Sequence, residues 1–339
     1  MNRHQQPARL WAIPRKVLKV SVSLTLIMLV PTVLAYALFG EAAALAVALG
    51  FVISLTPATK LPARYALAAV VPAAMTGAVA VALAGQAFPA ACFVALACLL
   101  VAPANVLQNG LLAGIPTVAA VYATLPMQQS PGTVAVGMLV GGAIAVGVAT
   151  RVQRTGELVG VDRRTSWRHA IAMAASVGAV VFAITTLDQP HGYWIPMTMT
   201  LVLRPYGAET LAIARDRIAG TLAGAVLALI MVLFLPSWTA IVAIIVLLVL
   251  LLAYAILGRY AQEVLFLTPF IVLLGTGGVA ADTVGLALQR ILATLLGTVL
   301  AGGIALALAR ADGDTTEDTG GAGGPAEGTA PGASDVAGR

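Results

Sequence analysis

Apolar residues run in long blocks along this chain, and each block ends at proline, glycine or charged residues. A helix needs about 20 apolar residues to cross the hydrocarbon core of a bilayer, and blocks of about that length recur throughout. The pattern predicts about 12 transmembrane helices. They are expected over residues 17–39, 41–58, 63–85, 88–105, 108–125, 131–150, 168–187, 191–203, 217–235, 238–257, 263–275 and 284–309.

The composition supports a membrane protein. Hydrophobic residues make up 60% of the chain, and charged residues only 10%. A soluble fold of this size needs more charged surface than 19 Lys and Arg and 14 Asp and Glu supply, whereas a surface that faces lipid needs none. We therefore expect an all-α, polytopic membrane protein.

The positions of the cations predict its orientation. If the N-terminus is cytoplasmic, every Lys and Arg except Arg290 falls in a cytoplasmic segment or at a cytoplasmic helix end. We expect a multi-pass protein of the inner or plasma membrane with both termini in the cytoplasm. The net charge of +5 then reflects topology and contact with anionic lipid, and nucleic-acid binding is not expected.

A hydrophilic stretch divides the chain into two sets of six spans. Pro57 corresponds to Pro205 and Pro116 to Pro269, at offsets of 148 and 153 residues, which suggests parallel halves. The predicted parts are a cytoplasmic N-terminus (1–16), a first six-helix membrane half (17–150), a cytoplasmic linker (151–167), a second six-helix half (168–310) and a disordered cytoplasmic tail (311–339).

A finer repeat lies within the second half. The twelve residues from Arg217 match those from Arg290 at eight positions, and Pro196 and Pro269 show the same offset of 73 residues. Three crossings per unit would make this a 3+3 inverted repeat, with Arg217 at the cytoplasmic end of one helix and Arg290 at the outer end of its mate. The alternative is coincidence in an apolar composition.

Two predicted spans, 191–203 and 263–275, are short and contain proline. They are either broken helices beside a cavity, or tilted or longer helices whose ends the hydropathy pattern misses. We expect structural roles for Pro196, Gly220, Gly224, Pro269, Thr294 and Gly297, since small residues allow close helix packing.

Cationic and aromatic residues among these apolar helices are candidate contacts for a substrate anion or for its translocation path. They are Tyr193, Trp194, Arg204, Arg215, Arg217, Thr221 and Arg290. The competing interpretations are interfacial anchoring for the arginines, an aromatic belt for the rings and helix packing for Thr221. Asp188 and His191 are candidates for proton coupling, with an ordinary loop as the alternative.

No catalytic or nucleotide-binding motif occurs in the sequence, so we expect neither an enzyme nor an ATP-driven pump. Cys92 and Cys98 lie on different helix faces with no His nearby, so no metal site and no cofactor are expected.

The motifs around residues 191–224 resemble the membrane domain of the fusaric acid resistance (FUSC) family of aromatic acid exporters. They are His191-Gly-Tyr-Trp-Ile-Pro196, then Arg204-Pro205, then Arg217-Ile-Ala-Gly-Thr-Leu-Ala-Gly224. The resemblance extends over about residues 165–310, and plant aluminium-activated malate channels are more distant relatives. Long family members also carry large cytoplasmic domains that this sequence does not show.

The resemblance implies an inner-membrane efflux transporter for aromatic or other organic carboxylate anions, driven by the proton gradient. The channel relatives also suggest a homodimer embedded in membrane lipid. A passive organic-anion channel and a membrane scaffold without transport are the alternatives.

Overall fold

The computed structural model describes residues 11–58, 62–106, 114–125, 129–150, 161–189, 191–234, 236, 239–276 and 280–317, and the regular structure in these ranges is helical. The helices are α1 (Arg15–Phe39), α2 (Glu41–Ala58), α3 (Ala63–Ala82), α4 (Ala87–Leu99), α5 (Val101–Val106), α6 (Ile115–Thr124), α7 (Pro131–Ala149), α8 (Arg163–Thr186), α9 (Trp194–Val202), α10 (Gly207–Phe234), α11 (Ala240–Leu257), α12 (Tyr260–Thr276) and α13 (Ala280–Glu317).

Eight of the described helical segments are long and apolar enough to cross a membrane, so the chain is a polytopic α-helical membrane protein. These segments are α1, α3, α4 joined to α5, α7, α8, α10, α11 and α13. The apolar parts of α2, α6 and α12 are shorter, and α9 has only nine residues. Twelve apolar segments therefore occur where twelve were expected, in the order long, short, long, four times over.

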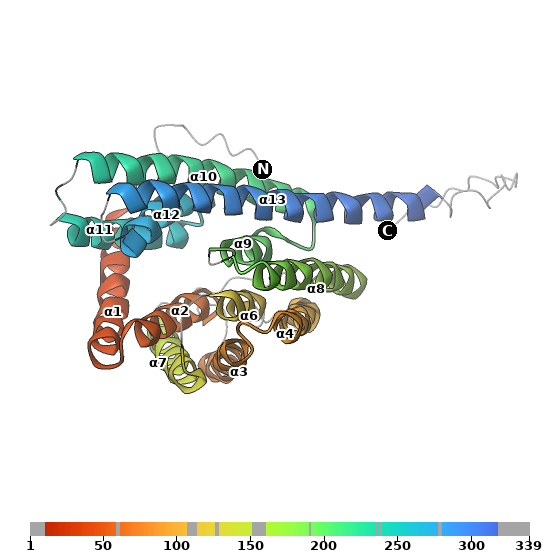
Figure 1. Ribbon diagram of the computed structural model, residues 1–339, viewed down its shortest axis with the longest axis horizontal. Coiled ribbons are helices and arrows are strands. Elements are labelled where there is room, and N and C mark those ends of the chain that lie inside the picture. The colour runs from red at the N-terminus through yellow and green to blue at the C-terminus, as the bar shows by residue number, and fades with distance from the viewer. Residues whose placement is uncertain are drawn as a thin grey trace, which may run out of the picture.

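The helices pair in a recurring way. In the first part of the chain α2 packs on α7 and α6 packs on α3, whereas in the second part α9 packs on α13 and α12 packs on α10. The order long, short, long divides the chain into four units: α1 to α3, α4 to α7, α8 to α10 and α11 to α13. Each short helix thus packs on the last helix of the neighbouring unit. The four initial helices form two pairs across the parts, α4 with α8 and α1 with α11. In Figure 1, α10 and α13 lie side by side, with α11 and α12 next to them.

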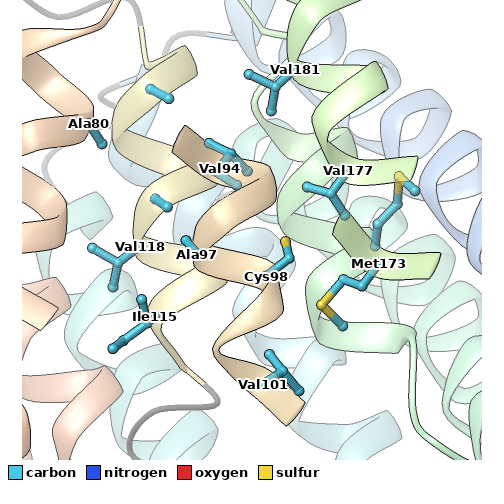
Figure 2. Packing of buried hydrophobic residues seen from close by; sticks show 14 of the residues in the cluster. Ala80, Val94, Ala97, Cys98, Val101, Ile115, Val118, Met173, Val177 and Val181 are labelled. Atoms are coloured by element: carbon cyan, nitrogen blue, oxygen red, sulfur yellow. The ribbon is translucent and has the colours of Figure 1, made fainter. Parts of the chain in front are cut away.

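The core where the two parts meet is built from small side chains. Figure 2 shows Val94, Ala97 and Cys98 of α4 between Val118 of α6 and Met173 and Val177 of α8. Alanine and valine let helix backbones approach closely, and close contact is a main source of packing energy between helices in a membrane. Consequently α8 packs chiefly on α4, although the sequence groups it with the second half.

Several predicted boundaries are wrong because a helix can extend beyond its apolar block. α10 begins at Gly207 instead of residue 217, and the Thr210 hydroxyl interacts with the backbone N–H and C=O of Arg204, 2.9 and 3.2 Å away. α8 begins at Arg163 inside the predicted linker, because the Asp162 carboxylate caps its first turn. α1 begins at Arg15, within the predicted N-terminal segment.

The predicted disordered tail is also partly wrong, since α13 continues to Glu317; residues 318–339 lie outside the described range, as does most of the predicted linker. The two short spans have different outcomes. α12 begins at Tyr260 and runs through Pro269 as one helix, so its predicted span was too short, not broken. α9 is a short helix that follows directly on a turn.

Candidate anion-binding site

Two arginines are buried among α9, α10, α12 and α13. Arg217 is 2% exposed and Arg290 is 1% exposed. Each is the eleventh residue of its helix, about 15 Å along the axis at 1.5 Å per residue. Neither arginine therefore stands at the first turn of its helix, because both helices begin earlier than their apolar blocks. That Arg217 lies toward the cytoplasmic side and Arg290 toward the outer side stays a prediction.

We call the surrounding residues the arginine cluster. Its members are Tyr193, Trp194, Thr198, Arg217, Tyr260, Glu263 and Arg290.

Arg217 connects three helices. Its Nη1 donates to the Tyr260 hydroxyl on α12 at 2.8 Å, and its Nη2 to the Thr198 hydroxyl on α9 at 3.5 Å. Its Nε is buried and has no hydrogen-bond partner. Both partners are neutral, so they orient the guanidinium without neutralising its charge.

Arg290 has fewer polar contacts. Its guanidinium carbon lies 4.2 Å from the centroid of the Trp194 ring, in a cation–π arrangement, and the Trp194 ring in turn contacts the Tyr193 ring in a tilted arrangement, with 4.4 Å between centroids. The Nε and Nη1 atoms of Arg290 are buried and have no hydrogen-bond partner. An unpaired buried N–H costs free energy, and a charged one costs more.

The two guanidinium groups lie within electrostatic range of each other, and Glu263 of α12 interacts with Arg217. In the part of the chain that the structure describes, neither buried arginine forms an ion pair. The cluster thus brings together two cations and one carboxylate. Its net positive charge, unused donors and aromatic rings suit an aromatic carboxylate.

Glycines set the distance between the helices that carry the arginines. A Cβ atom at Gly220 would lie 2.6 Å from the Ala261 carbonyl oxygen, and one at Gly224 would lie 2.6 Å from that of Leu265. A Cβ atom at Gly297 would lie 2.9 Å from the Ile195 carbonyl oxygen. α10 therefore lies tightly on α12, and α13 on α9.

The same positions relate the two helix pairs. Gly224 also faces Thr268, and Gly297 faces Ile195. Gly224 and Gly297 are 73 residues apart, and so are Ile195 and Thr268. The contact of Gly224 with Thr268 is therefore equivalent to the contact of Gly297 with Ile195 under the offset seen in the sequence. Pro196 and Pro269, also 73 residues apart, are both buried, and Pro269 packs near Gly224. Thr221 and Thr294 are buried at equivalent positions of α10 and α13.

The other sequence candidates lie apart from these contacts. Arg215 is exposed and forms an ion pair with Asp216 at 3.1 Å. Arg204 is partly buried after α9 and interacts electrostatically with His169. Asp188 and His191 are exposed at the turn between α8 and α9, where Asp188 has a left-handed φ of 49°.

Tyr260 and Glu263 were not among the sequence candidates. The apolar pattern placed the start of the helix at residue 263, so both residues were assigned to a loop or its edge. Their spacing of three residues places them on one face of a helix, and that spacing was the available signal.

Among the residues that the structure describes, no group of His, Cys, Asp and Glu is suited to hold a metal ion. A separate apolar groove of about 540 Å³ lies between α1 and α7, lined by residues that include Lys19, Leu24 and Ile144. It contains no residue of the arginine cluster.

Residues 167–304 match the family model described as fusaric acid resistance protein-like, a membrane-protein family associated with efflux. The match covers less than half of the chain, includes the whole arginine cluster, and confirms the resemblance noted in the sequence. The chain is also 32% identical over 151 residues to an uncharacterized protein of Synechocystis sp., an alignment that covers 42% of this chain. The chain spans only 19% of that relative's length. No solved structure matches the chain.

Proposed function

We propose that this protein is an inner-membrane transporter that exports aromatic or other organic carboxylate anions, coupled to protons. The observation that carries the proposal is the pair of buried guanidinium groups, Arg217 and Arg290, which lie within electrostatic range of each other and have unused N–H donors. Two like charges buried among membrane helices are costly unless an anion joins them. The Trp194 and Tyr193 rings beside Arg290 would contact the ring of an aromatic acid.

The architecture that we propose is two six-helix halves, each built from two inverted three-helix units. The long–short–long order of the helices and the pairing of each short helix with the neighbouring unit support it. Inverted repeats allow a central site to open alternately to the two sides of a membrane. Both termini are cytoplasmic in this proposal, since Arg15, Lys16 and Lys19 begin α1.

The test is transport by the purified protein in liposomes. Uptake of radiolabelled benzoate, an aromatic carboxylate, is measured with and without an imposed proton gradient, and membrane current is recorded in parallel. Accumulation under the proton gradient above that in protein-free liposomes is expected, the comparison being needed because neutral benzoic acid crosses a bilayer by itself. Arg215→Gln is the matched control, because it removes an exposed arginine only two residues from Arg217.

The other outcomes identify the alternative functions. Downhill benzoate flux with current, and no response to the proton gradient, would indicate a passive channel. Absence of both flux and current with folded protein would overturn the proposal and favour a scaffold role.

A further inference from the structure

We infer that Glu263 is the proton-binding group of the arginine cluster and takes up one proton when a carboxylate anion binds between Arg217 and Arg290. The inference rests on the proposed function, because it requires an anion in the cluster. It adds where the proton is held and in which direction it moves relative to the anion.

The position of Glu263 is fixed by the contact between α10 and α12. Gly220, one turn after Arg217, packs on the Ala261 carbonyl and on Val264, which flank Glu263. Tyr260, one turn before Glu263, accepts a hydrogen bond from Arg217 at 2.8 Å. Tyr260 and Glu263 therefore lie on the face of α12 toward Arg217, and Glu263 interacts with its charge.

The groups around Glu263 favour competition for Arg217. α12 packs on α10, α11 and α13, which bring Arg217, Tyr254 and Arg290 respectively. Arg259 and Tyr260 lie at the start of α12 itself, where the Arg259 carbonyl accepts the backbone N–H of Glu263. Of these groups, Arg217 is the one whose charge acts on Glu263.

A carboxylate that joins the two arginines would lie against the guanidinium that attracts Glu263. Two carboxylates at one cation repel each other, and the repulsion favours protonation of one of them. The incoming anion would be held by both guanidinium groups, so Glu263 receives the proton.

The charge balance is simple. Without substrate the cluster holds two guanidinium cations and the Glu263 carboxylate, a net charge of +1. With a monocarboxylate bound and a proton on Glu263 the net charge is again +1. Anion and proton thus bind together and cross together, so the exported species is equivalent to the neutral acid. The outward gradient of the acid then drives export, and an inward proton gradient opposes it, in contrast to the proton-driven export that the family resemblance implies.

The experiment is calorimetric titration of benzoate into the purified protein between about pH 6 and 8. Each titration is repeated in phosphate and in Tris at the same pH. Because these buffers differ in ionisation enthalpy, the difference in binding heat gives the number of protons taken up. The wild type should take up close to one proton per benzoate over part of this range.

Glu263→Gln should bind benzoate with no proton uptake, whereas Glu263→Asp should retain uptake. Glu209→Gln, at an exposed carboxylate in the first turn of α10, is the matched control and should behave as the wild type. Asp188→Asn and His191→Gln test the alternative proton carriers. Thermal melting of each variant shows that it is folded.

Benzoate binding to the wild type without proton uptake at any pH would overturn the inference and leave the proposed function standing. Proton uptake that persists in Glu263→Gln, or that is lost in Asp188→Asn or His191→Gln, would overturn it equally. No benzoate binding to the folded wild type would overturn both proposals. In liposomes an acidic exterior should raise benzoate uptake at least several-fold, and an acidic interior that does so would show exchange instead.

Discussion

Helices α13 and α7 each pack closely on a short helix through a glycine, but they bury different residues at the same spacing before that glycine. In α13, Gly297 packs on α9, and in α7, Gly141 packs on the backbone of α2. Seven residues before the glycine stands Arg290 in α13 and Val134 in α7, both almost completely buried. α10 and α3 show the same difference, with Arg217 before Gly224 and Val70 before Gly77.

The comparison separates scaffold from site. Buried residues of the first part are chiefly alanine, valine and glycine, which pack well and bind little. The second part uses the same kind of helix contact to hold two cations away from water, at a cost in stability. Such a cost is retained where the charge serves a function, and we therefore propose that the site lies in α9 to α13.

The largest expected effect on stability comes from placing a buried arginine in the first part of the chain, at the position that corresponds to Arg290. Val134→Arg places a cation at a completely buried position packed on apolar side chains such as Met138 and Tyr122. An uncompensated buried charge costs about 3–5 kcal/mol, so we expect loss of folded protein, measured by gel filtration in detergent. Val134→Leu adds volume without charge and should remain folded. A monodisperse, stable Val134→Arg protein would contradict the proposed division.

The converse change removes a charge from the second part. Arg290→Met should raise the melting temperature, because replacing buried ionic groups by apolar ones often stabilises by about 1–4 kcal/mol. Hydrogen bonds to charged groups contribute about 1.5–3 kcal/mol, so benzoate affinity should fall about 10- to 150-fold. Arg215→Met should change neither quantity. Unchanged affinity in Arg290→Met would exclude Arg290 from the site.

Arg217 allows a finer test of the same kind. Arg217→Ala should impair benzoate transport more than Arg217→Lys, since lysine keeps the charge but loses the planar fork that contacts both Thr198 and Tyr260. Initial rates of uptake in liposomes measure the difference. Equal rates for wild type, Arg217→Lys and Arg217→Ala would remove Arg217 from the transport path.

Glycine substitutions test the shared packing device. Gly297→Ala would bring a Cβ atom to 2.9 Å from both Ile195 and Thr198, and overpacking of this kind costs about 1–3 kcal/mol. Gly303→Ala in the same helix meets no atom within 4 Å and should be neutral or stabilising. Thermal melting compares the two variants, and similar melting temperatures would argue against close packing of α13 on α9.

The smallest effect concerns pH at the start of α8. Backbone hydrogen bonds, chiefly from Thr165, hold the pKa of Asp162 below its usual 3.8. A depressed pKa means that the cap stabilises the helix above about pH 4 and that this contribution is lost as the pH falls through the folded-state pKa. Hydrogen exchange at Arg164 and Thr165, corrected for intrinsic rates, should therefore accelerate in acid. Asp162→Asn should remove this pH dependence, and acceleration in that variant would rule out the cap as its cause.

The sequence predicted the helices better than the site, for a physical reason. Apolar blocks identify the lipid-facing parts of helices, so the all-helical, polytopic fold was predicted correctly, and eight of the described helical segments are long enough to cross a membrane. Helix ends depend on hydrogen bonds, such as those of Asp162 and Thr210, that hydropathy does not register. The early start of α10 makes Arg217 its eleventh residue instead of its first.

The arginine cluster was partly predictable. The offset of 73 residues relates Arg217 to Arg290 in the sequence itself, and the helix contacts of Gly224 and Gly297 follow the same offset. Glu263 and Tyr260 have no counterpart under that offset, because residues 190 and 187 are proline and leucine. Only the packing of α12 on α10 brings them to Arg217.

The burial of Arg217 also has a consequence for biosynthesis. α10 is made before α12 and α13, so it must enter the bilayer while Tyr260, Glu263 and Arg290 do not yet exist. An arginine within a membrane helix costs up to about 2.5–3.5 kcal/mol on insertion, and the 28-residue, largely apolar α10 offsets that cost. The finished contacts form only when the ribosome has completed α13. A nascent chain arrested after α10 therefore holds Arg217 with Thr198 of α9 as a partner but without the Tyr260 hydroxyl and the Glu263 carboxylate.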